Sequence, residues 1–148
     1  MESLMWRKKS SAGFDAYVVT VIHDEGMPAK EFREIQDQPG RKSCDKFSTT
    51  DLERSKDDQF PSEFWRTECF SEGALLAQIV QLVIVGNDSL YHVQRIWRVP
   101  ISDAERQTWI DHLSSIYVCD TRSAKKKCPE GFRKGDPPHN QPMQTDEP

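Results

Sequence analysis

The sequence predicts an α+β fold in which a small antiparallel sheet is covered by a C-terminal amphipathic helix. Three patterns support this prediction: a β-branched segment near the start of the chain, a hairpin pattern in its middle, and a capped helix pattern over 102–117. A chain of 148 residues has room for one domain. We expect that domain to span 1–118, with a disordered, basic and Pro-rich tail over 119–148.

The first elements are a strand and a short helix. Residues 16–22 read AYVVTVI, and their β-branched and aromatic side chains predict a strand over 15–23. Pro28 suits the first position of a helix, and the residues after it place Phe32 and Ile35 on one side.

The segment 37–60 is polar. Its only large or apolar residues are Cys44, Phe47, Leu52 and Phe60, too few to offset the entropy of ordering it alone. We therefore expect a long loop or partly disordered insertion there.

A hairpin is predicted over 76–85 and 90–99, because two apolar runs flank the turn formers GNDS. If Val85 pairs with Leu90, Leu82 lies opposite Val93. One face of the pair then carries Val80, Leu82, Ile84, Tyr91, Val93 and Trp97, with Arg95 as the exception. The rival interpretation is a helix capped by Ser71 that runs through 74–77 and past Val80. The β-branched run after Gln78 argues against that helix.

The last element is an amphipathic helix over 102–117. Ser102 and Glu105 have the spacing of a capping box. The apolar residues Trp109, Ile110, Leu113, Ile116 and Tyr117 then fall on one face at helical spacing. We expect this face to pack on the sheet, with 61–70 or a partner chain covering an outer edge.

Residues 101–113, ISDAERQTWIDHL, resemble the end of a pleckstrin-homology-like domain. In that family a final strand leads into a capped helix whose Trp and Leu close one end of a curved sheet. The resemblance implies such packing roles for Trp109 and Leu113. It also implies a phosphoinositide-binding alternative through Arg7, Lys8 and Lys9, which precede a strand as the family's basic loop does.

Composition and cysteines bear on the compartment. A net charge of −4 argues against general affinity for nucleic acid backbones. We see no secretory signal and no apolar run long enough to span a bilayer, so we expect a cytoplasmic or nuclear protein. The four cysteines are then expected to be reduced, with Cys69 a buried thiol. A Cys119–Cys128 bridge and a zinc site recruiting His112 or His139 stay open as alternatives.

Catalytic motifs do not stand out. The phosphate-binding glycine motifs, G-x-S-x-G and H-E-x-x-H do not occur, so we expect neither catalysis nor a cofactor or metal. The enzyme alternative is a general base or metal site built from His23, Asp24 and Glu25. We read this cluster as a solvated turn, because adjacent turn residues point in different directions.

We therefore expect a non-catalytic interaction or adaptor module that docks a protein partner through an aromatic patch and a free sheet edge. Trp6, Phe64 and Trp65 are the predicted anchors, because aromatic residues often dominate interface energies. The first alternative is a phosphoinositide or anionic membrane surface bound by Arg7, Lys8 and Lys9. Nucleic acid is an alternative only through the basic tail, and we expect no small-molecule ligand.

Overall fold

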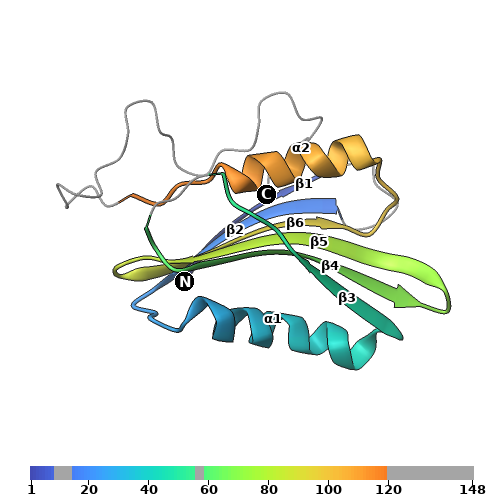
Figure 1. Ribbon diagram of the computed structural model, residues 1–148, viewed down its shortest axis with the longest axis horizontal. Coiled ribbons are helices and arrows are strands. Elements are labelled where there is room, and N and C mark those ends of the chain that lie inside the picture. Colours follow the sequence, from blue (N-terminus) through green and yellow to red (C-terminus); the bar gives the residue numbers. More distant parts are fainter. Residues whose placement is uncertain (9–14, 56–58, 120–148) are drawn as a thin grey trace.

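The computed structural model describes residues 1–8, 15–55 and 59–119, so the predicted tail over 119–148 lies outside them except for Cys119. One antiparallel sheet has α1 on one face and α2 on the other (Figure 1). Its strand order is β1-β2-β6-β5-β4-β3. The elements in chain order are β1 (Glu2–Arg7), β2 (Asp15–His23), α1 (Ala29–Ser43), β3 (Lys46–Asp51), β4 (Ser62–Ser71), β5 (Ala74–Val85), β6 (Ser89–Trp97) and α2 (Asp103–Ser114). The α+β class and the antiparallel sheet are confirmed.

The central hairpin has the register that the sequence predicted. Val85 lies opposite Leu90, and Leu82 lies opposite Val93. The residues predicted for the apolar face all belong to, or pack against, the core cluster that includes Trp109 and Leu113 of α2. The rival helix is excluded, because β5 begins at Ala74. The prediction succeeded because a single register sorted both strands into apolar and polar faces.

The predicted sheet lacked three of the strands that the structure shows, β1, β3 and β4. No strand was predicted over Glu2–Arg7, which forms β1. Residues 61–70, expected to cover an edge, form most of β4, which pairs with β5 on one side and β3 on the other. The predicted loop over 37–60 instead contains the second half of α1 and all of β3. Only 56–58 of that segment lie outside the described residues.

Tertiary contacts explain why the polar segment is ordered. The helix α1 runs past Pro39 to Ser43. At Gly40 a Cβ would come within 2.5 Å of the Phe47 ring, so the absence of a side chain lets β3 lie close under the helix. A disulfide joins Cys44, the residue after α1, to Cys69 on β4, with the two Cα atoms 5.5 Å apart. This corrects the expectation of reduced thiols, and no cysteine in the described ranges is free.

The helix α2 begins as predicted and ends at Ser114, three residues earlier than expected. The Ser102 hydroxyl accepts a hydrogen bond of 3.1 Å from the Glu105 backbone N–H. Trp109 and Leu113 are each 0% exposed, consistent with the packing roles that the resemblance implied. Within 1–8, 15–55 and 59–119, none of the helices combines the length and apolar character needed to cross a membrane.

Candidate functional site

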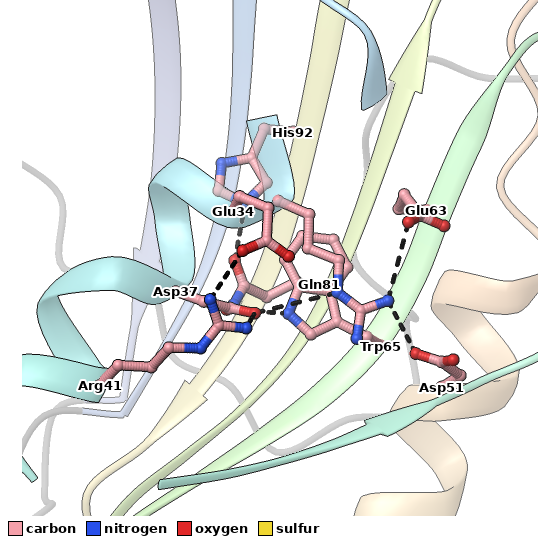
Figure 2. A network of polar contacts seen from close by, with 9 residues as sticks. Glu34, Asp37, Arg41, Asp51, Glu63, Trp65, Gln81 and His92 are labelled. Atoms are coloured by element: carbon pink, nitrogen blue, oxygen red, sulfur yellow. Dashed lines mark hydrogen bonds and ion pairs between the residues drawn. The ribbon is translucent and has the colours of Figure 1, made fainter. Parts of the chain in front are cut away.

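The face of the sheet under α1 carries a polar network (Figure 2). Asp37 points from α1 toward the sheet, and its carboxylate accepts a hydrogen bond of 3.1 Å from the indole N–H of Trp65 on β4. Arg33 and Arg41 lie one turn before and after Asp37, at 3.9 and 3.8 Å from its Oδ2. The spacing i, i+4, i+8 places all three side chains on one stripe of the helix. The network therefore fixes α1 on β4.

Arg33 joins the same helix to two further strands. Its Nη1 lies 2.7 Å from Oδ1 of Asp51 on β3 and 3.8 Å from Oε1 of Glu63 on β4. Its guanidinium also stands over the Trp65 ring, 5.1 Å from the centroid. A planar cation can combine stacking with carboxylate pairing in this way. Arg33 is thus a clamp between α1 and the β3–β4 pair.

Two of the acidic residues of α1, Asp37 and Glu34, have shifted pKa values. Burial raises the pKa of Asp37 above its usual value, and the Trp65 hydrogen bond and the nearby arginines act against that shift. Glu34 is solvent-exposed, and its hydrogen bond from Arg41 lowers its pKa. The Arg41–Glu34 contact of 2.8 Å is a surface ion pair beside the buried carboxylate.

His92 on β6 lies under the same helix. Its Nε2 is 2.9 Å from Oε1 of Gln81 on β5, and because an amide oxygen only accepts, the imidazole donates this bond. Phe32 of α1 packs against the imidazole edge to face, 5.0 Å between centroids. Burial lowers the pKa of His92 to about 4, so the ring is neutral near pH 7. His92 is on the hairpin face that α1 covers, so this polar side chain is only 4% exposed.

The network is closed to substrates. A general base must come within hydrogen-bond reach of the proton that it takes. Asp37 is 1% exposed and His92 is 4% exposed, and each is already held by a neighbouring strand. Their arrangement supports a role in holding α1 on the sheet.

The predicted enzyme cluster after β2 does not converge. His23 Nδ1 is 3.2 Å from the Ser89 hydroxyl, and His23 Nε2 is 3.4 Å from the Glu2 carboxylate. Glu25 instead accepts a hydrogen bond from the Met27 backbone N–H, at 2.9 Å. Asp24 has a φ of 58°, and its backbone N–H donates to the Asp88 carbonyl. The three residues fold a turn, each with a different partner.

The metal-site alternative was tested on all the described residues. In the described part of the chain no group of three or more His, Cys, Asp or Glu side chains is placed to hold a metal ion.

The predicted aromatic anchors have separate positions. Phe64 is 4% exposed in the core under α2, and Trp65 is 0% exposed in the core under α1. Side chains this buried leave no area for a partner, so the predicted aromatic patch is corrected at both positions. Trp6 is half-buried and stacks on Tyr17, 5.2 Å between centroids. The sequence showed that these aromatics cluster but not which way they face.

The predicted basic cluster is divided by the geometry of β1. Successive side chains of a strand point to opposite faces. Arg7 lies opposite Ala16 at the end of β1, and Lys8 follows it on the other face. Lys9 lies outside the described residues. The two described cations therefore do not form one patch on a single face of the sheet.

The outer edge of β1 is the best candidate binding surface. Among the described residues no strand pairs with this edge, because β1 is the first strand in the sheet order. Three of the exposed large apolar residues lie here: Met1 at 84%, Leu4 at 61% and Met5 at 48%. An unpaired strand edge with apolar side chains is a template for pairing with another chain.

The hydrogen bonds of β1 identify which backbone groups face outward. The Lys8 N–H donates to the Asp15 carbonyl of β2, at 3.1 Å. Residues of an antiparallel strand alternate between pairing toward one neighbour and the other. Trp6, Leu4 and Glu2 therefore bond toward β2. The N–H and C=O groups of Ser3, Met5 and Arg7 point away from the sheet.

An apolar hollow lies at the end of the central hairpin that is farther from the turn between β5 and β6. Its volume is about 270 Å³, and its lining includes Leu75, Leu76, Trp97 and Pro100. Leu75 and Leu76 are 41% and 50% exposed. The lining offers few polar groups to orient a ligand, which binding sites for small molecules usually provide.

Comparisons with known proteins give the fold and no activity. No protein-family model matches the chain. No curated protein matches it either. Among solved structures the chain is similar to PA94 from Pseudomonas aeruginosa, described as a protein of unknown function and a candidate regulator. The similarity has a TM-score of 0.56 at 11% identity and covers 81% of this chain and 85% of that one. The pleckstrin-homology-like resemblance stays a prediction.

Proposed function

We propose that the protein is a non-catalytic interaction module that binds a polypeptide partner as an added strand along the outer edge of β1. The proposal is supported above all by the outward-facing backbone groups of Ser3, Met5 and Arg7 beside the exposed side chains of Leu4 and Met5. Strand addition takes its affinity from main-chain hydrogen bonds and its specificity from alternate side chains. The edge of β1 offers both.

The opposite edge of the sheet is less suited to this role. β3 reads KFSTTD, with a charge at each end and Phe47 and three hydroxyl side chains between. None of the exposed large apolar side chains of the described residues lies on it. Polar and charged residues of this kind protect an edge strand from pairing. We therefore assign partner binding to β1 alone.

The test compares two proline substitutions, one on each edge. Met5→Pro removes an outward N–H from β1 and leaves the bonds to β2 in place. Thr49→Pro is the matched control on β3. Leu52 N–H donates to the Phe64 carbonyl, so the odd-numbered residues of β3 point outward and Thr49 is one of them. Far-UV circular dichroism and thermal unfolding establish that both variants fold.

The readout is affinity capture by the full-length chain from the cells that make it. Proteins held by the wild type and by Thr49→Pro but lost with Met5→Pro are expected, and each is then purified and titrated against the three proteins. If Met5→Pro captures the same proteins with the same affinity as the wild type, the β1 edge is not the binding surface.

The disulfide is evidence about the cellular compartment in which the proposed module works. Disulfides persist in oxidising compartments and are rare in cytosol and nucleus. The Cys44–Cys69 bond therefore favours an oxidising compartment over the cytoplasmic or nuclear one that the sequence predicted. Alkylation of the chain in intact cells tests this. Cys44 and Cys69 resist the reagent until a reductant is added if the compartment is oxidising, and react at once if they are thiols there.

A further inference from the structure

We propose that the polypeptide bound by β1 is the β1 strand of a second copy of this chain, paired antiparallel about a two-fold axis at Met5. The inference rests on the proposed function, since both need β1 as the docking edge. It names the partner from the distribution of charge and backbone groups along Glu2–Lys8.

Symmetry restricts the possible registers. Two antiparallel strands of identical chains are related by a two-fold axis perpendicular to the sheet, which keeps each face on its own side. Residues opposite each other across an antiparallel pair point to the same face. The axis must therefore lie midway between one residue and the same residue of the second copy, so that this residue faces its own symmetry mate. In the middle of β1 this residue can be Leu4 or Met5.

Charge distinguishes these two registers. Centring on Met5 places Glu2 opposite Lys8 of the second copy, and the symmetry repeats this pair at the other end. Leu4 then lies opposite Trp6 of the second copy, so apolar side chains meet between the charges. Centring on Leu4 instead places Glu2 opposite Trp6 and gives no charge pair. Opposite charges and apolar pairs stabilise directly opposed positions.

The backbone agrees with the Met5 register. Met5 is one of the residues whose N–H and C=O groups face outward. Met5 and its symmetry mate would exchange both hydrogen bonds across the axis, as would each Ser3 with the opposing Arg7. Leu4 and Trp6 fall at the intervening positions, where side chains of opposed residues approach more closely.

The side-chain environment of Glu2 fits this arrangement. The carboxylate is 73% exposed, and its contact with His23, at 3.4 Å, lies on the same face of the sheet as Leu4 and Trp6. In the dimer Glu2 would lie between His23 of its own chain and Lys8 of the second copy.

The other edge lacks this self-complementarity. Lys46 and Asp51, the charged ends of β3, are separated by an odd number of positions and point to opposite faces. No two-fold register can place them opposite each other. Two copies are therefore expected to join through β1 and leave β3 at both outer edges of the combined sheet.

Sedimentation velocity at rising concentration of the full-length protein tests the dimer. The wild type and Thr49→Pro are expected to shift from monomer to dimer over the same concentration range. Met5→Pro is expected to stay monomeric at ten times that concentration. A wild type that stays monomeric at every concentration overturns the inference, and so does a Met5→Pro variant that dimerises as the wild type does.

A charge exchange tests the register. Glu2→Lys and Lys8→Glu each place like charges opposite one another, and we expect each to weaken dimerisation at least fivefold. The double variant restores opposite charges and is expected to recover most of that loss. Glu2→Lys also loses the His23 contact, but the double variant loses it as well, so recovery reports on the pair with Lys8. Absence of recovery contradicts the Met5 register.

Cysteine cross-linking locates the axis independently. Opposed residues of a hydrogen-bonded pair have Cα atoms about 5.5 Å apart, within the range of a disulfide. Met5→Cys is expected to give a covalent dimer on mild oxidation, visible on a non-reducing gel. A covalent dimer of Leu4→Cys in place of Met5→Cys would show the Leu4 register and overturn the inference.

The outcomes separate this inference from the proposed function. A monomeric wild type whose captured proteins are lost with Met5→Pro would reject the second copy as partner and retain strand addition at β1. A dimer that survives Met5→Pro, together with unchanged capture, would reject both.

Discussion

Arg95 of β6 and Asp15 of β2 form an ion pair inside the protein, where each side chain is 1% exposed. The guanidinium also stands over the rings of Trp97 and Trp109, 4.6 and 4.7 Å from their centroids, and donates to the Ala16 carbonyl. Burial lowers the pKa of Arg95, and its hydrogen bond to Asp15 acts in the opposite direction. The residue that seemed misplaced on the apolar face of the hairpin is thus held by a carboxylate and two aromatic rings.

Removing one partner of this pair should leave a buried charge without compensation. We expect Asp15→Ala to lower the free energy of unfolding by about 3–5 kcal/mol. The double variant Asp15→Ala/Arg95→Met removes both charges and should recover a large part of that loss. Urea unfolding followed by tryptophan fluorescence measures both. A double variant as unstable as Asp15→Ala would show that the cost comes from lost packing and not from the unpaired charge.

The disulfide should stabilise the α1–β3–β4 region by restricting the unfolded chain. Cys44 and Cys69 close a loop with a sequence separation of 25 residues. The chain-entropy relation gives about 3.5 kcal/mol for a loop of this size. We expect Cys44→Ser/Cys69→Ser to lose about that much stability without reductant. In dithiothreitol the wild type and the variant should unfold at the same urea concentration, and a difference that persists there contradicts the prediction.

The parts of the fold that could be predicted from the sequence are those marked by a local pattern of apolar and polar residues or by a helix cap. The hairpin register followed from side-chain alternation alone, and Val85 opposite Leu90 is observed. The start of α2 followed from the Ser102 cap. In both cases one face is buried and the other is polar, so a shift of one residue would bury polar side chains.

The remaining strands depend on contacts between distant residues. β3 contains one large apolar side chain, Phe47, which lies against Gly40 of α1. Its order comes from pairing with β4 and from the disulfide beside it. Neither contact leaves a periodic pattern in the sequence, so composition indicated a loop.

The candidate site shows the same limit. Trp65 and Trp6 are both aromatic residues in strands, yet Trp65 lies in an interior strand under α1 while Trp6 lies on an edge strand. Only the strand order distinguishes these environments. The edge of β1 could not be identified before it was known that β1 pairs with β2 on one side alone.

Asp37 provides a test of the network under α1. Burial raises its pKa, which means that the ionised form is less favourable in the folded protein than in the unfolded chain. Asp37→Asn keeps an acceptor for the Trp65 N–H and removes the charge. We therefore expect it to keep the wild-type free energy of unfolding at pH 7 within about 1 kcal/mol.

Asp37→Ala is the contrasting variant. It leaves the indole N–H of Trp65 buried without an acceptor, which costs about 1–3 kcal/mol. Urea unfolding at pH 7 compares the two variants. If Asp37→Asn is as destabilising as Asp37→Ala, attraction to Arg33 and Arg41 outweighs the burial of the charge.

His92 should make stability depend on pH. Burial lowers its pKa from 6.5 to about 4 in the folded protein. Between these values the unfolded chain binds a proton that the folded protein does not. Its contribution to stability is therefore fully present above about pH 6.5 and is lost as the pH falls toward 4. The integrated loss is up to about 3 kcal/mol.

The variant His92→Gln isolates this effect, because it can still donate to Gln81 but does not titrate. Burial also lowers the pKa of His112, which adds a slope of the same sign, and the raised pKa of Asp37 adds one of the opposite sign. Both groups are present in wild type and variant, so the difference between the two stability curves reports on His92. Urea unfolding at a series of pH values from 4 to 7.5 should give a shallower curve for His92→Gln. Parallel curves would mean that His92 is protonated as readily in the folded protein as in the unfolded chain, contrary to its burial beneath Phe32.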